Sequence, residues 1–436
     1  MKNSSSKKIL VLGTSDKGGA AEYCYKLACL LKDQGNEVVL YVNHKSKNDD
    51  FIIEHKVDVI KKTILEKIKL KIIKKYNKLN PPEILKLDDK YCYFGINETV
   101  STINPEKIIN HIGFVPEFIF SGWTAGFLNS TDLLLLQQYS KAKLYTISVD
   151  MNHLTGGCHY AWDCKGFING CSSDCPAILS EGYKDLAKIN FEAKLNNAHL
   201  GNFKIISGSG WTLKQAQESK IYKNQDFFPN LNSLIDTQLM KLTSKKIAKE
   251  YFNLDSEKFY ILMGCQYGNE PRKGFEYLLE SLQITYSKLN VEEREKINVL
   301  IVSSDKVNSF DEIPFEKTHI EYITDYKVLS LLYQAVDVFV NSSVEDSGPM
   351  MVSEALACGT PVVGFDMGVV NNLVITGFNG YKARLKESND LAQGILDIYK
   401  LSPTEYKNYS NNAIDHIQKY SSFEYAITVL NNILNQ

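Results

Sequence analysis

Short apolar runs alternate with amphipathic stretches from one end of the chain to the other. Each run is nearly continuous in aliphatic and aromatic residues, a pattern that predicts buried strands. A first set comprises Lys8–Gly13, Glu37–Val42, Glu117–Gly122, Ala142–Asp150 and Phe203–Gly208. A second set comprises Lys258–Cys265, Ile297–Ser304, Ile320–Thr324, Val336–Ser343 and Pro361–Phe365.

The stretches between these runs have the apolar periodicity of helices. One of them, Ala20–Gly35, stops at a glycine, as helices commonly do at their C-terminus. Buried strands that alternate with helices indicate an α/β protein with parallel sheets covered on both faces. Two such sets predict two Rossmann-like domains, residues 1–228 and 229–412, with a junction near Phe227–Asp236. We expect a last helix, within 413–436, to cross back to the first domain.

The composition is that of an ordinary globular protein. The 436 residues carry a formal net charge of −2, which gives no general attraction to nucleic acid. No apolar run approaches the roughly 18 residues that a membrane span requires, and the first apolar run is too short for a secretory signal. We therefore expect a cytoplasmic protein whose nine cysteines are thiols or metal ligands.

An acidic segment, EDSGPMMVSEALACGTPVVG, directly follows one predicted strand at Glu345–Gly364. We expect a loop to Gly348 and then a helix that starts at Pro349, with Asp346 in the loop and Glu354 on the helix. Ligands of parallel sheets bind beyond the carboxyl ends of strands, and carboxylates accept hydrogen bonds from hydroxyl groups. The alternative is that these carboxylates only cap the helix or face solvent. Their combination at the end of a strand favours a ligand site.

A basic pair, Arg272 and Lys273, falls between a predicted strand that ends near Cys265 and a helix that begins around Gly274. Arginine can clamp two phosphate oxygens and lysine adds a point charge, so the pair suits a phosphate ligand. An exposed basic dipeptide without a ligand is the alternative.

A glycine-rich turn, GTSDKGGAAEY, follows the first predicted strand. Its spacing fits neither G-x-G-x-x-G nor the P-loop pattern, which argues against a dinucleotide oxidoreductase and a P-loop NTPase. Gly18 and Gly19 would let the backbone approach a ligand closely at the start of the next helix, although a simple tight turn explains them equally well.

A cysteine-rich excursion near residues 150–176 holds four of the nine cysteines. Four thiolates can bind Zn²⁺ tetrahedrally and staple a loop that has no core of its own. The spacing is not that of a standard paired finger. We favour a structural zinc site over free thiols, with disulfides the least compatible with the expected compartment, and His159 could replace one thiolate as a ligand. The expected ligands are Cys158, Cys164, Cys171 and Cys175.

The stretch EDSGPMMVSEALACGTPVV resembles the C-terminal signature of family 4 glycosyltransferases, which have the GT-B fold of two Rossmann-like domains facing across a cleft. The resemblance implies that Glu354 binds the donor's ribose and that Asp346, here in place of the usual Glu, holds the donor sugar. It also implies that Arg272 and Lys273 bind the donor diphosphate. The further donor-binding residues it implies are Gly18, Gly19, Ser347, Gly348, Pro349, Met350 and Met351.

The Thr155–Tyr160 segment is similar to one in glycosyltransferases that build colanic-acid-like exopolysaccharides. In that group a His-Asp pair precedes the segment, whereas this chain has Val149-Asp150. His153 or His159 then compensates for the missing side chain, or the chain functions without it.

The resemblance implies a retaining glycosyltransferase that moves a sugar from a nucleotide-sugar, a UDP- or GDP-sugar, to a saccharide acceptor, free or lipid-linked. The chain contains no D-x-D pair, so we expect no catalytic metal. The alternatives are a nucleotide-sugar epimerase of the same fold and a non-catalytic sugar-binding protein. An epimerase would need no acceptor, and a binding protein would need no paired basic and acidic site.

A lysine-rich stretch, Lys61–Leu79, has Ile64, Ile68 and Ile72 on one helical face and only Glu66 as an acid. A surface helix packed on the core and a helix attracted to anionic lipid are equally compatible with this pattern. The second reading would place the protein peripherally on the inner face of the cell membrane.

Overall fold

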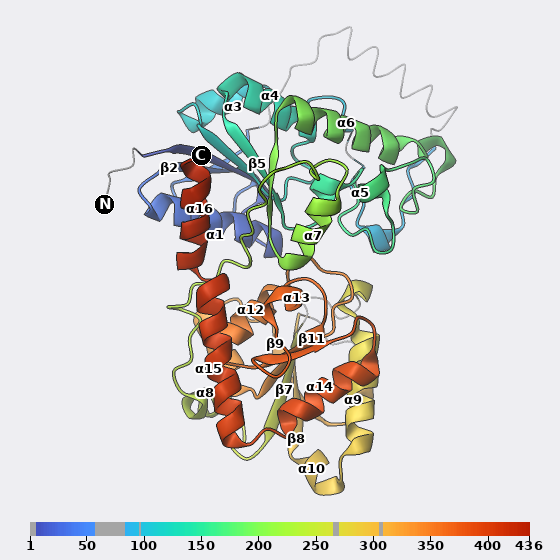
Figure 1. Ribbon diagram of the computed structural model, residues 1–436, viewed down its shortest axis with the longest axis vertical. Coiled ribbons are helices and arrows are strands. Elements are labelled where there is room, and N and C mark those ends of the chain that lie inside the picture. Colours follow the sequence, from blue (N-terminus) through green and yellow to red (C-terminus); the bar gives the residue numbers. More distant parts are fainter. Residues whose placement is uncertain (1–5, 57–82, 96, 265–269, 305–307) are drawn as a thin grey trace.

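The computed structural model describes residues 6–56, 83–95, 97–264, 270–304 and 308–436. Two parallel six-stranded sheets, each covered by helices, form two domains that lie one above the other in Figure 1. The predicted α/β class with two Rossmann-like domains is therefore confirmed. The stretch Lys61–Leu79 lies outside the described residues.

The sheet of the N-terminal domain has the strand order β3-β2-β1-β4-β5-β6. Its strands are β1 (Lys8–Ser15), β2 (Glu37–His44), β3 (Ile52–Glu54), β4 (Phe118–Ser121), β5 (Lys143–Ser148) and β6 (Lys204–Ser207). Its helices are α1 (Gly19–Asp33), α3 (Pro105–Ile112), α4 (Ser130–Ser140), α5 (Gly166–Asn169), α6 (Leu186–Leu200) and α7 (Gly210–Glu218). Leu10 and Leu12 of β1 face one core and Ile9 and Val11 face the other, so this central strand is buried on both sides.

The sheet of the C-terminal domain has the order β12-β11-β10-β7-β8-β9. Its strands are β7 (Phe259–Gly264), β8 (Ile297–Ser303), β9 (Glu316–Glu321), β10 (Val338–Asn341), β11 (Val362–Phe365) and β12 (Gly380–Ala383). The helices of this half of the chain are α8 (Lys245–Tyr251), α9 (Phe275–Lys288), α10 (Val291–Glu295), α11 (Tyr326–Ala335), α12 (Met350–Ala357), α13 (Val370–Leu373), α14 (Ser388–Tyr399), α15 (Pro403–Tyr420) and α16 (Phe423–Leu434).

The sheet edges differ from the sequence-based prediction. The edge strands β3 and β12 were not predicted, because β3 has three residues and β12 has the weakly apolar sequence GYKA. The strand predicted at Ile320–Thr324 lies at Glu316–Glu321. This β9 is an edge strand with the polar sequence EKTHIE and no fully buried residue, and charged edges of this kind protect a sheet from unwanted pairing.

The last two helices serve different domains. Helix α15 packs on α12 and α13 of the C-terminal domain. Helix α16 contacts α1, and its Leu430 and Ile433 belong to the core of the N-terminal domain, so the chain returns to its first half (Figure 1). The boundary at residues 228 and 229 and the start of the returning segment at 413 stay predictions, and position 413 falls inside α15. None of the helices in the described ranges is both long and apolar enough to cross a membrane.

Direct hydrogen bonds join the two domains. The hydroxyl of Ser209, the residue before α7, donates to the carbonyl oxygen of Ser347 at 2.5 Å. The amide of Gly210 donates to the side chain of Asn372 at 2.9 Å. These bonds bring the N-terminus of α7 against the loop that precedes α12 and against α13.

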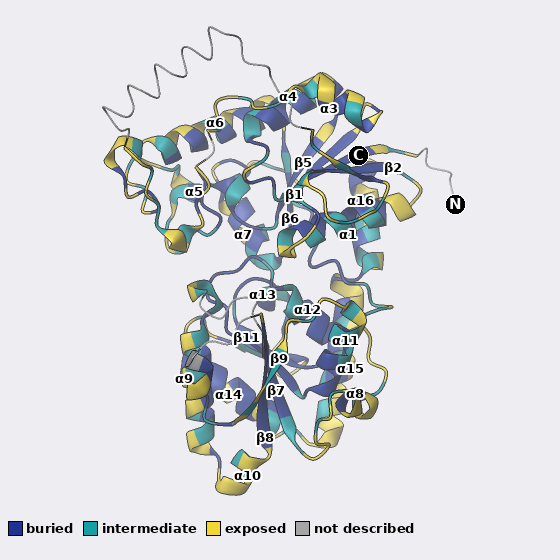
Figure 2. Cartoon of the chain, turned by 180° about the vertical axis from the view of Figure 1, so that it is seen from behind, coloured by how far each residue is buried: buried dark blue, intermediate teal, exposed yellow. Residues whose placement is uncertain are grey.

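Seen from behind, the burial colours show that the strands of both sheets are predominantly buried (Figure 2).

Candidate functional site

The acidic loop, residues 342–349, connects β10 to α12 at the carboxyl end of the C-terminal sheet. Helix α12 begins at Met350 with Pro349 as its N-cap, one residue later than predicted. The neighbouring strand β7 is followed by a short 3₁₀ helix, Pro271–Lys273. Because β7 and β10 are adjacent in the sheet, the basic pair and the acidic loop come together, as the sequence predicts.

Arg272 and Lys273 converge on one carboxylate oxygen of Asp346. Lys273 Nζ lies 2.6 Å and Arg272 Nη1 lies 2.9 Å from Asp346 Oδ2. Arg272 Nε also donates to Glu270 Oε1 at 2.5 Å. Both basic side chains are held at the position where a phosphate ligand could replace or join Asp346 as their partner.

The backbone between β7 and α9 requires a glycine at position 274. Gly274 has φ of +62°, and a Cβ there would lie 2.1 Å from the carbonyl oxygen of Ser342. The hydroxyl of Ser342 donates to the carbonyl oxygen of Lys273 at 2.8 Å. The amide of Val344 donates to the carbonyl oxygen of Arg272, also at 2.8 Å. The close approach of the two loops therefore fixes the backbone that carries the basic pair.

Two neighbouring carboxyl groups in the acidic loop have opposite protonation behaviour. Burial opposes the charge of Asp346, but Lys273 and Arg272 outweigh it and hold the pKa of Asp346 at about 2. Burial, together with the charges of Asp346 and Asp163, raises the pKa of Glu345 to about 7. Asp346 is thus an anion at neutral pH, whereas Glu345 gains or loses its proton near neutral pH.

Glu354 lies apart from the charged cluster of Arg272, Lys273 and Asp346. Its Oε2 accepts a hydrogen bond from the hydroxyl of Tyr333 on α11 at 2.8 Å, and its side chain is buried. Burial raises the pKa of Glu354, and Lys26 of α1 opposes that rise. Lys26 comes from the N-terminal domain and lies 4.8 Å from the ring centroid of Tyr326. Glu354 therefore sits where the two domains meet.

The remaining loop residues make contacts within the protein. The Gly348 amide, which the resemblance assigns to the donor sugar, donates to Asp346 Oδ1 at 3.2 Å. The carbonyl of Ser347 accepts from Ser209. The side chain of Met351 fills the space beside Gly264, where a Cβ would lie 2.4 Å from its methyl group. Met350 is half-buried.

Gly18 and Gly19 open helix α1, with Gly18 as the N-cap at φ of +109°. Space is open around both, because a Cβ at either would meet no atom within 4 Å among the described residues. The turn before them is anchored by Asp16, which accepts hydrogen bonds from the amides of Ser46 and Lys47 at 2.8–2.9 Å. The helix terminus is thus fixed in place while its glycines stay uncovered.

The four cysteines of the excursion lie in one neighbourhood, where their charges would influence one another. Burial raises the pKa of Cys171 to about 11 and that of Cys158 further still. In the part of the chain that the structure describes, no three His, Cys, Asp or Glu side chains form a group able to hold a metal ion. Zinc binding stays a prediction, and the packing of Tyr93 over Gly157 shows that the excursion also has apolar support.

The two histidines near Val149 have different partners. His159 Nδ1 lies 2.5 Å from Asp150 Oδ2, and its ring is buried beside Phe94 and Trp123. The Trp123 indole nitrogen lies 3.1 Å from the same Nδ1. The shorter contact to a carboxylate takes precedence, so Nδ1 carries a proton that it donates to Asp150.

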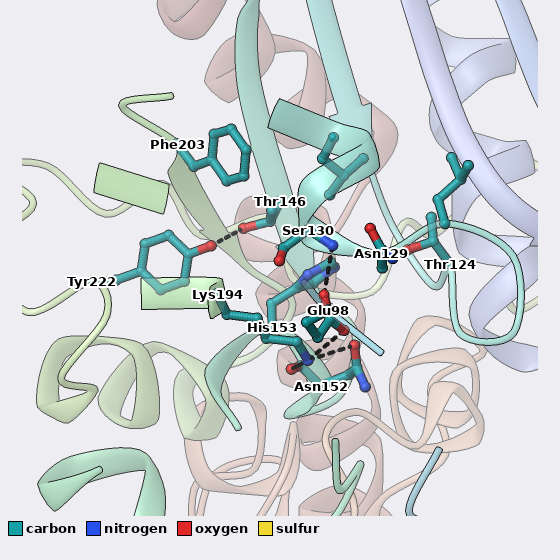
Figure 3. Close-up of a pocket in the computed structure, with 12 residues that line it drawn as sticks. Glu98, Thr124, Asn129, Ser130, Thr146, Asn152, His153, Lys194, Phe203 and Tyr222 are labelled. Atoms are coloured by element: carbon teal, nitrogen blue, oxygen red, sulfur yellow. Dashed lines mark hydrogen bonds and ion pairs between the residues drawn. The ribbon is translucent and has the colours of Figure 1, made fainter. Parts of the chain in front are cut away.

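His153 Nε2 instead lies 3.0 Å from the carbonyl oxygen of Gly122. Its ring borders a small cavity of about 20 Å³ in the N-terminal domain, shown in Figure 3, which has room for a single water molecule. Thr124, Thr146 and Tyr222 also line this cavity. It is too small for a sugar or a nucleotide, so it is not the ligand site.

Sequence reasoning missed three residues that shape the site. Glu270 fixes Arg272 Nε, Tyr333 holds Glu354, and the ring of Tyr160 lies 4.7 Å from the Arg272 guanidinium. Glu270 could have been suspected from its place two residues before Arg272. The two tyrosines are distant in sequence from their partners, and no local pattern marks them.

Comparisons with known proteins agree with this geometry. Residues 258–400, which include both halves of the charged cluster, match the family described as glycosyl transferases group 1. A curated relative, D-inositol 3-phosphate glycosyltransferase 2 of Catenulispora acidiphila, is 23% identical over 205 residues. That alignment covers 44% of this chain and 46% of the relative, so it spans about half the length of each.

Solved structures resemble the whole chain. Sucrose-phosphate synthase of Thermosynechococcus elongatus has a TM-score of 0.64 at 16% identity, with 99% of each chain covered. HepE of Anabaena, in complex with UDP-glucose, has a TM-score of 0.62 at 14% identity, with 99% of this chain and 100% of that chain covered. At these identities the likeness establishes the fold. The chain has the GT-B fold, and its C-terminal domain matches the group 1 glycosyl transferases.

Proposed function

We propose that this protein is a retaining glycosyltransferase of the family 4 type that transfers a sugar from a UDP- or GDP-sugar to a saccharide acceptor. The observation that carries the proposal is the convergence of Arg272 and Lys273 on Asp346 at the carboxyl ends of β7 and β10. This cluster lies within the segment that matches the group 1 glycosyl transferases. The complex of HepE with UDP-glucose supports a nucleotide-sugar donor.

The proposed chemistry depends on the leaving group. When the bond from the anomeric carbon to the diphosphate breaks, negative charge grows on the diphosphate, and fixed cations stabilise it. Arg272 and Lys273 supply these cations without a bound metal, and displacement of Asp346 Oδ2 by a phosphate oxygen would free both for the ligand. Asp346 then turns its carboxylate to the hydroxyls of the donor sugar. Retention of configuration is inferred from the sequence resemblance.

A ligand panel tests the proposal. UDP, GDP, ADP and their sugars are added in a thermal-shift assay, and any nucleotide that stabilises the protein is confirmed by calorimetry. The sugar that binds is then incubated with saccharide acceptors, and the anomeric configuration of the product is read by NMR. Protection by none of the nucleotides would refute the proposal, and a changed sugar nucleotide without an acceptor would indicate an epimerase instead.

The acceptor side of the proposal concerns polysaccharide assembly. We infer from the Thr155–Tyr160 resemblance that the acceptor belongs to exopolysaccharide assembly, and from the lysines of residues 61–79 that it is lipid-linked. The lysines of residues 61–79 would hold the protein at an anionic membrane, each contributing about 1 kcal/mol near the surface. Sedimentation with anionic vesicles should fall with salt and on replacing Lys69, Lys71, Lys74 and Lys75 by Glu. Absence of the protein from the vesicle pellet at low salt would contradict this part.

A structural zinc ion in the excursion is a separate proposal. A Cβ at Gly166 would lie 3.2 Å from Cys171 Sγ and 3.5 Å from Cys164 Sγ, so two of the four thiols lie close together, which supports it. Metal analysis of protein purified without a metal-affinity step should approach about one zinc per chain if the site is a closed Cys₄ site. Four alkylatable thiols and no zinc would refute it.

A further inference from the structure

The ring of Tyr160 makes a contact between the two domains at the basic pair. Tyr160 belongs to the N-terminal domain, and its ring centroid lies 4.7 Å from Cζ of Arg272 in the C-terminal domain. Burial raises the pKa of Tyr160 well above its ordinary range, so the phenol is neutral. The negative face of a neutral aromatic ring attracts a guanidinium, and the attraction is stronger when both groups are withdrawn from water.

The contacts of Arg272 leave its guanidinium little freedom. Within the plane of the group, Nε is held by Glu270 and Nη1 by Asp346. The ring of Tyr160 adds a third contact, with its centroid 4.7 Å from the Cζ atom. Among the described residues no protein group accepts from Nη2, so this nitrogen stays available to an oxygen of a ligand. Without the ring, the guanidinium could rotate out of the orientation that presents Nη2.

Tyr160 is itself held firmly by the loop that carries it, residues 150–160, which we call the arm. The amides of His159 and Tyr160 both approach the carbonyl oxygen of Tyr91, at 3.1 and 3.4 Å. The carboxylate of Asp150 holds His159 Nδ1 at 2.5 Å, and the amide of Met151 donates to the carbonyl of His159 at 3.1 Å. The arm is therefore folded back on itself directly before Tyr160.

A buried ion pair contacts the arm at Asn152 (Figure 3). Lys194 Nζ donates to the carbonyl oxygen of Asn152 at 2.7 Å and lies 3.5 Å from Glu98 Oε1. Both charged side chains are more than nine-tenths buried. The Asn152 amide nitrogen lies 3.3 Å from His159 Nε2. A continuous set of contacts thus runs from the ion pair through Asn152 and His159 to the residue that covers Arg272.

We propose that Tyr160 is a positioning residue for the donor diphosphate, which acts by fixing the orientation of Arg272 from across the domain interface. The inference rests on the proposed function, because it assumes that Arg272 binds the diphosphate. It adds that the phosphate-binding cation of the C-terminal domain is complete only when the arm of the N-terminal domain is in place. Tyr160 itself touches no reacting atom.

The test compares two substitutions at Tyr160. Tyr160→Phe keeps the ring, so affinity for the nucleoside diphosphate and turnover should stay within about twofold of wild type. Tyr160→Leu removes the aromatic face and should weaken both by about tenfold, the size expected for a buried cation–ring contact. Tyr139→Leu, at an exposed tyrosine of α4, is the control and should change neither. Equal melting temperatures of the Phe and Leu variants show that both are folded.

A double-mutant cycle separates positioning from a general loss of structure. In the Arg272→Ala background Tyr160→Leu should have no further effect on binding of UDP or GDP, because the residue through which it acts is gone. An undiminished effect in that background, or equal loss in Tyr160→Phe and Tyr160→Leu, would overturn the inference. Normal nucleotide binding by Tyr160→Leu would overturn it alone, whereas wild-type protein that binds no nucleotide would refute the proposed function together with it.

Discussion

The two sides of the contact between Tyr160 and Arg272 are built in different ways. The acidic loop and the basic pair of the C-terminal domain are assembled by charge, over two adjacent parallel strands. The arm of the N-terminal domain is assembled by hydrogen bonds to backbone groups and by the buried Lys194–Glu98 ion pair that contacts Asn152. The charges of the first side are the proposed partners of a ligand, whereas the groups of the second side are paired within the protein.

We therefore expect substitutions on the two sides to change different properties of the protein. Loss of a charge in the C-terminal cluster should change ligand binding and turnover more than stability, because the remaining groups are partly accessible to water. Loss of a charge in the Lys194–Glu98 pair should change stability, because it leaves an unpaired ion in the interior.

The largest effect is expected from Lys194→Met. Breaking a buried ion pair by removing one partner costs about 3–5 kcal/mol, because Glu98 would remain buried without its counter-ion. Urea unfolding followed by circular dichroism measures the free energy of unfolding. Lys188→Met, at an exposed lysine on the same helix, should be nearly neutral. A loss below 1 kcal/mol in Lys194→Met would show that the arm does not depend on this pair.

On the other side, Arg272→Ala and Lys273→Ala should each lower turnover by about 100-fold or more, by analogy with loss of one fixed donor that stabilises transition-state charge. The free energy of unfolding should change much less than in Lys194→Met. Lys288→Ala, at the exposed end of α9, serves as the control for a lost positive charge. Near-normal turnover in both variants at the cluster would remove the basic pair from the proposed mechanism.

The sequence alone predicts the charged side of this contact but not the arm that supports it. Arg272, Lys273 and Asp346 could be predicted to meet, because each follows a strand and parallel strands end at one edge of a sheet. The pairing of Tyr160 with Arg272 depends on how the two domains are oriented, and nothing near Tyr160 in the sequence encodes that. The Lys194–Glu98 pair was not predicted for a similar reason, since its partners are 96 residues apart and each looks like an ordinary surface charge.

The strands of the two sheets differ in the same way in how well the sequence predicts them. Central strands such as β1 and β8 are buried on both faces and can be recognised in the sequence as apolar runs. The edge strand β9 is stabilised on one side only and has a polar sequence, so its start was predicted four residues too late. The apolar pattern therefore predicts the strands that are buried on both faces. It does not predict an edge strand, or a side-chain contact between residues that are distant in the sequence.

Glu345 offers a test of the charge balance in the acidic loop. A carboxyl whose pKa is raised from 4.5 to about 7 on folding lowers stability as pH rises between these values, because the unfolded chain loses its proton first. Asp346, with its pKa lowered to about 2, behaves in the opposite way and contributes stability that is lost only as pH falls below about 4.

Glu345→Gln should therefore stabilise the protein relative to wild type by about 3 kcal/mol more at pH 8 than at pH 4.5. Denaturation by urea at the two pH values measures this difference. The matched change in the same loop, Asp346→Asn, should reduce stability at pH 8, because Lys273 and Arg272 lose their common partner. A stability difference between Glu345→Gln and wild type that does not vary with pH would show that folding does not shift the pKa of Glu345.

The smallest effect is expected at Glu354, where a role in ligand binding is hardest to separate from a structural role. Its carboxylate is buried like the supporting residues of the arm, yet the sequence resemblance assigns it to the donor's ribose. Glu354→Gln keeps an oxygen that can accept from the Tyr333 hydroxyl, so the free energy of unfolding should change by less than about 1 kcal/mol.

Affinity for the nucleoside diphosphate should fall by up to about tenfold in Glu354→Gln, because a neutral amide is a weaker acceptor for ribose hydroxyls than a carboxylate. Tyr333→Phe is the matched variant, since it removes the hydrogen bond and keeps the charge, and it should lower stability more than affinity. Calorimetry with UDP and GDP, alongside urea unfolding, separates the two. If Glu354→Gln binds nucleotide as tightly as wild type, Glu354 is a supporting residue of the domain interface, and the charged cluster around Asp346 alone accounts for donor binding.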